Sequence, residues 1–327
     1  GQGRVEVAAI DPVASMQAGD KPNLARIGKK RVIPYPPPPR RILAGAALRH
    51  SGFPTIKRAL WLAKRQQADL FLLHALDYAP EETETQDYDT GKQRAADARH
   101  QLERLQAAHP EIREVRVTTD RCWRALTETA AELEADLIVI GTHIHGRLQA
   151  LLGTTGDQVL QHLSRNVLMV RTEASPEGQP AADYRHLLVV SDLLPHCSAA
   201  ARQAADLAAD LGARITLLHV VEHFPTDREN DAIAPENEDP LTFRQRTRAR
   251  DLQAFAAANG LGSAEQRVEV TTGTAGEMVP EVAREIGADL VVLGGPASSL
   301  WHRLLGSRAE AIVNHAPCDC LLVLPPG

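Results

Sequence analysis

Apolar and polar positions alternate in blocks along most of the chain. Short runs rich in Val, Ile and Leu, such as HLLVV and RITLLHVV, are followed by segments in which apolar residues recur with a helical period, such as SAAARQAADLAADLGA. The first kind predicts strands that are buried on both faces, and the second predicts amphipathic helices. Their alternation predicts a parallel sheet between helix layers, the doubly wound α/β class.

The second half of the chain shows this pattern most clearly, with Gly212 and Gly260 placed to end two helices. It predicts five strands at 186–192, 214–221, 267–273, 289–295 and 320–325, and four helices at 198–213, 239–260, 275–288 and 307–316. The first half of the chain predicts the same alternation of strands and helices.

The two halves repeat each other in sequence. One block aligns ILAGAALRHSGFPTIKRALWLAKRQQADLFLLHALDY with LLVVSDLLPHCSAAARQAADLAADLGARITLLHVVEH at a constant offset, and a later block aligns ADLIVIGTHIHGRLQALLGTTGDQVLQHLSRNVLMVR with ADLVVLGGPASSLWHRLLGSRAEAIVNHAPCDCLLVL. Such self-similarity indicates a duplicated domain. The repeat predicts an N-terminal arm at 1–38, a first domain at 39–172, a linker at 173–183 and a second domain at 184–327. We call the two domains copy one and copy two.

The arm at 1–38 has no sustained apolar period and carries four successive prolines, Pro36 to Pro39. Prolines in a row favour the extended polyproline form, which makes a stiff tether. The same segment could instead dock on a partner, either another chain or the protein's own surface. The sequence leaves both interpretations open.

Composition narrows the classes of function. The net charge of −6 argues against a nucleic-acid partner, and no apolar run has the length of a membrane span. No secretory leader is recognisable, and four cysteines without a dense framework favour a reducing cytoplasm. We therefore expect a cytoplasmic protein.

Open parallel sheets bind ligands at the carboxyl ends of their strands. In copy two this edge offers Ser191 and Asp192 after the first strand, and the loop Gly294 to Ser307 after the fourth; copy one offers Ala46, Ala47 and the loop Gly141 to Thr154. A Gly followed by Ser or Thr at a helix start exposes backbone N–H groups that attract phosphate.

These segments resemble the universal stress protein family. The matching pieces occur in the same order in both copies: LLHAL and LLHVV, ADLIVIGTH and ADLVVLGG, LLGTT and LLGSR, and finally NHAPCDCLLVL. The resemblance implies a five-stranded domain of the adenine nucleotide α-hydrolase-like type in each copy. It also implies that the copies pair through their last strands, NVLMV and CLLVL, as a pseudo-dimer with further homo-oligomeric assembly open to it.

One branch of that family binds ATP through an Asp after the first strand and a loop reading G-x-x-G, nine residues, then G-Ser/Thr. Both loops here are one residue short of that spacing, and Ile144 and Ala297 occupy the second Gly position. A Cβ there blocks close approach to a phosphate. Copy one also carries Ala47 in place of the Asp. We expect no cofactor, with ATP in copy two as the alternative. The candidate residues are Asp192, Gly294, Gly306 and Ser307 in copy two and, more weakly, Gly141, Gly153 and Thr154 in copy one.

Several histidines and cysteines are interpreted as packing or surface residues rather than as site residues. His74 and His219 lie in the middle of apolar strands, and Cys318 and Cys320 have one residue between them rather than the two of a redox or zinc motif. His143 and His145 have no third ligand nearby, so we expect no metal site. No G-x-S-x-G elbow, Walker loop or H-E-x-x-H helix occurs, and we expect no catalytic residues.

The sequence thus favours a non-enzymatic stress-response module that binds or regulates, with degenerate nucleotide sites. The first alternative is an ATP-binding protein with slow ATPase activity in copy two. The second is a dedicated subunit of a larger assembly, docked through the proline-rich arm.

Overall fold

The computed structural model describes residues 39–46, 48, 53–76, 87–142, 165–171, 181–222, 238–295 and 309–324. The arm at 1–38 lies outside them. In copy one the elements follow in this order: β1 (Arg41–Gly45), α1 (Phe53–Gln66), β2 (Asp69–Ala75), α2 (Asp87–Ala108), β3 (Ile112–Thr118), α3 (Cys122–Glu132), β4 (Leu137–Thr142) and β5 (Asn166–Arg171).

Copy two repeats the alternation of strand and helix. Its elements are β6 (His186–Val190), α6 (Cys197–Leu211), β7 (Arg214–Glu222), α8 (Pro240–Ala258), β8 (Glu265–Thr271), α9 (Ala275–Ile286), β9 (Leu290–Gly294), α11 (Glu310–His315) and β10 (Asp319–Val323). None of the helices within the described ranges combines the length and apolarity that crossing a bilayer requires.

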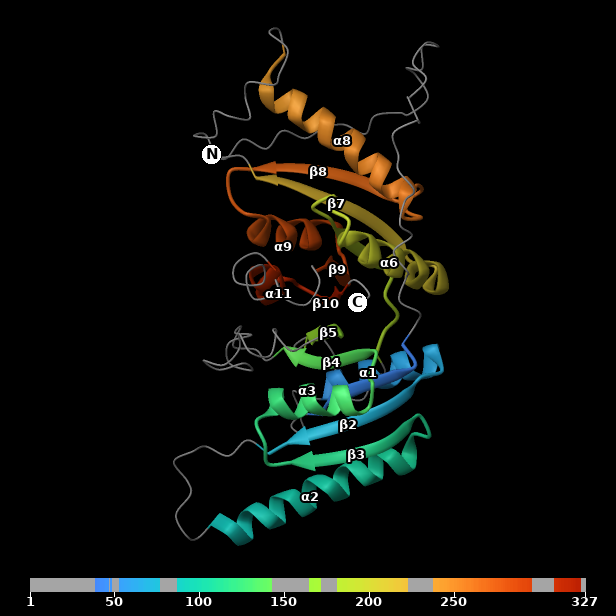
Figure 1. Cartoon of the computed structure of the whole chain (residues 1–327), viewed down its shortest axis with the longest axis vertical. Coiled ribbons are helices and arrows are strands. Elements are labelled where there is room, and N and C mark those ends of the chain that lie inside the picture. The colour runs from blue at the N-terminus through green and yellow to red at the C-terminus, as the bar shows by residue number, and fades with distance from the viewer. Residues whose placement is uncertain are drawn as a thin grey trace. The chain divides into compact units, whose positions relative to one another are not determined.

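The strands form one ten-stranded sheet in the order β3-β2-β1-β4-β5-β10-β9-β6-β7-β8 (Figure 1). Among the strands of the described ranges, all neighbours within a copy are parallel, and only the β5–β10 pair is antiparallel. The predicted fold class is confirmed, since each copy contributes five parallel strands and helices flank them. The two sheets are continuous with each other because the last strands of the copies pair.

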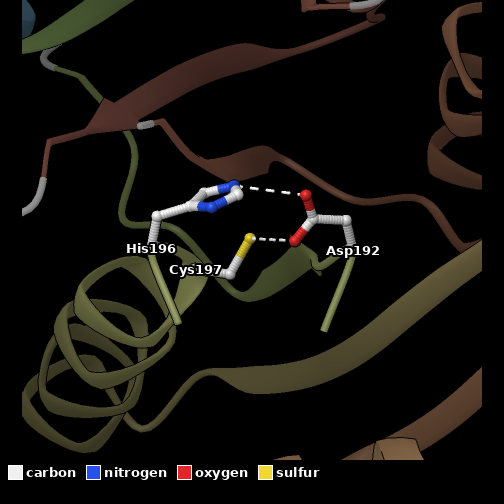
Figure 2. Close-up of side chains that lie close together, drawn as sticks. All are labelled: Asp192, His196 and Cys197. Carbon is white, nitrogen blue, oxygen red and sulfur yellow. Dashed lines mark hydrogen bonds and ion pairs between the residues drawn. The ribbon is translucent and has the colours of Figure 1, made fainter. Parts of the chain in front are cut away.

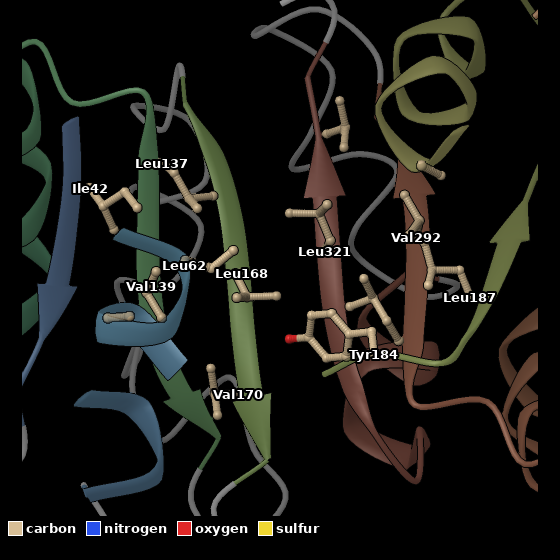
Figure 3. Close-up of a cluster of buried hydrophobic side chains, with 14 of the residues drawn as sticks. Ile42, Leu62, Leu137, Val139, Leu168, Val170, Tyr184, Leu187, Val292 and Leu321 are labelled. Atoms are coloured by element: carbon tan, nitrogen blue, oxygen red, sulfur yellow. The ribbon is translucent and has the colours of Figure 1, made fainter. Parts of the chain in front are cut away.

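Both faces of the sheet are buried, which explains the nearly continuous apolar strands. Along β6, Leu187 and Val189 join one apolar cluster whereas Leu188 joins the other. The first cluster receives side chains from α1, α2, α6 and α8, and the second from α3, α9 and α11. Figure 3 shows part of the first cluster, including Leu168 on β5 and Leu321 on β10. A strand between two helix layers has no polar face, so its sequence cannot alternate.

Glycines end two helices, and Gly212 is the one of the two that the sequence predicts; the other predicted glycine, Gly260, lies one residue beyond Asn259, which caps α8, and has φ of 78°. Gly212 follows α6 with φ of 64°, and Gly287 follows α9 with φ of 63°. In each case the glycine N–H donates to a carbonyl of the last turn. This left-handed cap costs a residue with a Cβ about 1–2 kcal/mol.

We expect Gly212→Ala to lower the free energy of unfolding by about 1 kcal/mol, because no atom crowds the site and only the positive φ is unfavourable. Gly262→Ala is the matched control. That site is also open and its φ lies outside the left-handed range, so the change should be neutral or slightly stabilising. Urea denaturation of both variants measures the difference. If both variants lost the same free energy of unfolding, the positive φ of Gly212 would not be the cause.

The junction between the copies has an approximate twofold relation. β5 and β10 pair as Cys320 with Met169, Leu321 with Leu168, and Leu322 with Val167. Leu168 and Leu321 occupy the same position in the repeat, so equivalent residues face each other at the centre. The pairing through NVLMV and CLLVL is therefore present within the chain.

A buried charged group lies beside this junction. The Asp319 carboxylate on β10 accepts hydrogen bonds from Arg58 Nε on α1 (3.1 Å), the Tyr184 hydroxyl (2.7 Å) and the Arg171 backbone N–H (2.9 Å). Burial raises the pKa of the Asp319 carboxyl above its ordinary value, and the charge of Arg58 opposes that rise. The Arg58 guanidinium also lies 4.1 Å from the centre of the Tyr184 ring. Asp319 thus connects copy two to the first helix and the last strand of copy one.

The equivalent group on the other side of the junction is neutral. Asn166 corresponds to Asp319, and its Oδ1 accepts the Leu324 backbone N–H at 2.9 Å as Asp319 accepts that of Arg171. Its Nδ2 donates to Gln203, the counterpart of Arg58 in the repeat. One side of the junction is therefore an ion pair and the other an amide pair.

A second pair crosses the junction between helices α1 and α6. Arg65 donates to the Asp210 side chain (2.7 Å) and to its backbone carbonyl (2.8 Å). These two residues also occupy the same position in the repeat. The copies thus place opposite charges where a duplicated sequence would place identical ones.

Candidate functional site

The candidate site lies at the carboxyl end of β6, where the chain turns into α6. The Ser191 hydroxyl accepts the Leu193 N–H at 3.0 Å, and Asp192 Oδ1 accepts the Leu194 N–H at 2.9 Å. Leu193 has φ of 68°, a left-handed conformation that is unfavourable for a branched side chain. The two side-chain hydrogen bonds stabilise this turn, which directs Asp192 back toward the start of α6.

Three side chains converge there, those of Asp192, His196 and Cys197 (Figure 2). His196 Nε2 lies 3.2 Å from Asp192 Oδ2, and the Cys197 thiol donates to Asp192 Oδ1 at 3.2 Å. One donor atom from each residue lies within 4.8 Å of the others. Cys197 is buried, whereas about half of the Asp192 side chain is exposed.

The carboxylate determines the protonation state of the cluster. Burial opposes ionisation of Asp192, but hydrogen bonds from His196, the Leu194 N–H and Cys197 outweigh it and lower the pKa to about 2. Burial and the negative charge of Asp192 raise the pKa of the Cys197 thiol to about 12. Reactive cysteines need a low thiol pKa. Cys197 is therefore not arranged as a nucleophile.

Gly294, at the end of β9, packs directly against the first turn of α6. A Cβ at Gly294 would lie 2.8 Å from Cys197 Cα and 3.2 Å from the His196 carbonyl oxygen. The next N–H, that of Gly295, donates to Val323 within the sheet at 2.9 Å. The glycine at this position is accounted for by the close approach of strand and helix.

The first N–H groups of α6 also have partners in the turn. The Cys197 N–H donates to the Leu194 carbonyl at 3.0 Å, and the Ser198 N–H donates to the Pro195 carbonyl at 3.1 Å. A helix start attracts phosphate through N–H groups that lack a partner. Neither of these two N–H groups is free to bind phosphate.

The structure brings together two of the predicted site residues, Asp192 and Gly294, through their shared contacts with Cys197. Gly141 is the second-last residue of β4, at the carboxyl end of that strand in copy one. The remaining predicted positions lie outside the described residues: Gly153, Thr154, Gly306 and Ser307, together with Ala47, Ile144 and Ala297.

The strand histidines have the structural role predicted for them. His74 Nδ1 donates to the Ala46 carbonyl at 2.6 Å, and His219 Nδ1 donates to the Ser191 carbonyl at 2.8 Å. The two bonds are equivalent in the repeat, although His219 is buried and His74 is half-buried. Burial lowers the pKa of His219. Each imidazole holds the end of its copy's first strand beside the second.

Cys318 and Cys320 are free thiols on or next to β10. Cys320 belongs to the second apolar cluster, and Cys318 packs against it. Burial raises the pKa of Cys318 to about 12. Both pack as small apolar groups, as predicted.

His196 and Cys197 were not predicted from the sequence as partners of Asp192. The signal is present as D-x-x-x-H-C across a strand–helix junction. His196 and Cys197 follow Asp192 by four and five positions, but the intervening residues are not helical. The proximity therefore depends on the turn at Leu193 and Leu194, which a helical or strand period does not predict.

The sheet topology and the pairing of β5 with β10 define a tandem α/β protein, in which two doubly wound copies are joined through their last strands. The family model described as the Universal stress protein family matches residues 39–171 and again 183–323. The chain belongs to the universal stress protein family.

Curated relatives agree with this assignment. Universal stress protein E of Escherichia coli K12 is 28% identical over 214 residues, which cover 63% of this chain and 66% of that protein. The matched part is thus just under two thirds of that relative. Universal stress protein A homolog 1 of Coxiella burnetii is 31% identical over 141 residues, covering 43% of this chain and 96% of its own.

Among solved structures, a universal stress protein from Archaeoglobus fulgidus superposes with a TM-score of 0.61 at 15% identity. The match covers 89% of this chain and 98% of that one. It supports the tandem fold.

Proposed function

We propose that the chain is a stress-response module that binds or regulates and does not act as an enzyme, with nucleotide sites that have become degenerate. Family membership supports the stress-response part. One solved universal stress protein is a complex with cAMP, so a nucleotide is a ligand that any test of this chain must include.

One observation carries the proposal: Asp192 and Gly294, the two candidate nucleotide-binding residues of copy two that the structure describes, already have other partners. The Asp192 carboxylate accepts hydrogen bonds from Leu194, His196 and Cys197. Gly294 is in close contact with the first turn of α6. A nucleotide would have to displace these contacts before it could use either residue. The high pKa of the Cys197 thiol further supports a role other than nucleophilic catalysis.

A thermal-shift titration tests the proposal. A site with Kd about 100-fold below the ATP concentration would add about 2.7 kcal/mol to the stability of the folded chain. That corresponds to a rise in Tm of several degrees for domains of this size. We expect Tm to be unchanged with ATP or cAMP, with or without Mg²⁺, and no nucleotide to co-purify.

A rise in Tm that is lost in Asp192→Ala would instead support the ATP-binding alternative in copy two. Asp206→Ala, which changes a carboxylate of α6 away from this edge, is the matched control and should behave like the wild type in that case.

The chain's cysteines bear on its compartment. All four are free thiols, at Cys122, Cys197, Cys318 and Cys320, which supports the proposed cytoplasmic setting. Homo-oligomeric assembly, docking through residues 1–38 and the boundaries at 172, 173, 183 and 184 stay predictions.

A further inference from the structure

The cluster at the end of β6 has the composition of a metal site. Asp192, His196 and Cys197 supply a carboxylate oxygen, an imidazole nitrogen and a thiol sulfur from one short segment. Bonds of about 2.0–2.3 Å to such donors in a tetrahedral site place neighbouring donors about 3.3–3.6 Å apart. His196 Nε2 lies 3.2 Å from Asp192 Oδ2, and the Cys197 sulfur lies 3.2 Å from the other carboxylate oxygen, Oδ1. One donor atom of each residue lies within 4.8 Å of the others, so modest side-chain movement brings the three donors to the spacing of a single ion.

We propose that copy two binds one Zn²⁺ ion between the side chains of Asp192, His196 and Cys197. Mixed oxygen, nitrogen and sulfur donors suit zinc better than Mg²⁺ or Ca²⁺, which prefer oxygen alone. Three protein ligands leave the fourth coordination position of a tetrahedral ion open. Because the Asp192 side chain is half-exposed, water can reach that position. On binding, Zn²⁺ takes the place of the thiol proton, which leaves to water, and a zinc–sulfur bond forms.

The surrounding structure holds two of the three donors in place. Cys197 is 4% exposed, and Gly294 packs against its Cα from the neighbouring strand. Asp192 is oriented by the Leu194 N–H. The His196 side chain is 21% exposed, so we expect it to be the ligand that moves to complete the site. A site formed by a short segment and backed by a rigid strand loses little freedom when the ion binds.

The repeat provides an internal comparison. At the constant offset of the first aligned block, Asp192, His196 and Cys197 correspond in sequence to Ala47, Ser51 and Gly52. None of these three is a carboxylate, imidazole or thiol. The inference therefore concerns copy two alone. The zinc site shares Asp192 with the candidate nucleotide site but needs no phosphate, and the cobalt band reports it separately from nucleotide binding.

Cobalt substitution tests the inference in the full chain. Co²⁺ occupies tetrahedral zinc sites and reports a thiolate ligand by a sulfur-to-cobalt charge-transfer band. We expect the reduced protein to show that band with equimolar Co²⁺ and to lose it when Zn²⁺ is added. Asp192→Asn, which keeps an acceptor for the Leu194 N–H, and His196→Gln should each weaken binding by about 100-fold or more, since even partners outside the ligand shell contribute 10–100-fold.

Cysteine variants decide which thiol binds. Cys197→Ser should abolish the charge-transfer band, whereas Cys318→Ser should leave it unchanged. Circular dichroism of each variant shows whether it folds. The inference is overturned if folded wild-type protein gives no band at a several-fold excess of Co²⁺, or if the band persists in folded Cys197→Ser.

Discussion

Replacing Arg58 with alanine should lower the free energy of unfolding by about 3–5 kcal/mol, because it leaves the buried Asp319 carboxylate without its cation. Arg58 and Asp319 are 3.1 Å apart, and their side chains are only 13% and 9% exposed. The change also removes the contact of the guanidinium with the Tyr184 ring. Urea denaturation at neutral pH measures the loss.

The loss in Arg58→Ala should also depend on pH. Burial raises the pKa of Asp319, so the folded state holds this proton more tightly than the unfolded chain does. Stability from such a group is fully present below its unfolded pKa and falls as pH rises through the folded value. Without Arg58 that fall is larger, so the variant should be closest to the wild type in acid.

A double variant provides the control. Arg58→Gln combined with Asp319→Asn copies the amide pair that Gln203 and Asn166 form at the equivalent place. It leaves no unpaired charge, so most of the lost stability should return. If the single and double variants are equally unstable, the ion pair is not the reason for the loss.

The second large effect is expected for Gly294→Ala. The added Cβ would lie 2.8 Å from the Cα of Cys197. This Cα belongs to the first turn of α6, so it can move away only if the helix backbone shifts. Overpacking that forces the backbone to shift costs about 1–3 kcal/mol and occasionally more. We expect a loss of that size in protein without any ligand, measured by thermal or urea unfolding.

Gly45→Ala is the matched control. Gly45 also ends a strand, but the nearest atoms to its Cβ are flexible side chains of Ile140 and Leu126 at 3.7 Å, so the effect should be small. A nucleotide role for Gly294 predicts the opposite pattern: normal stability in Gly294→Ala with impaired ATP binding.

The sequence predicted the architecture well because its signals are local. Apolar runs defined the strands, and Gly212 sits where α6 ends, as predicted from the sequence alone. Because the two copies align, each strand and helix was predicted from two independent stretches of sequence. The repeat also showed that His74 and His219 share a role, which their bonds to Ala46 and Ser191 explain.

The features that the sequence did not reveal depend on contacts between distant or irregular segments. Arg58 and Asp319 lie 261 positions apart, and Asp319 directly precedes the strand predicted at 320–325 with nothing in the sequence to mark it as buried. Gly294 was interpreted as a phosphate-binding glycine because the sequence does not show that α6 covers it.

The junction between the copies carries an ion pair on one side and an amide pair on the other. This difference restricts which domains of two such chains can pair with each other. If copy two met copy two of another molecule, Asp319 would face Gln203 and the two Asp210 carboxylates would face each other. If copy one met copy one, Arg58 would face Asn166 and two Arg65 side chains would meet. Either homotypic match buries a charge without a counterion or places like charges together. Each half is therefore a poor substitute for the other, and gene fission into interchangeable single domains would require compensating substitutions at these positions.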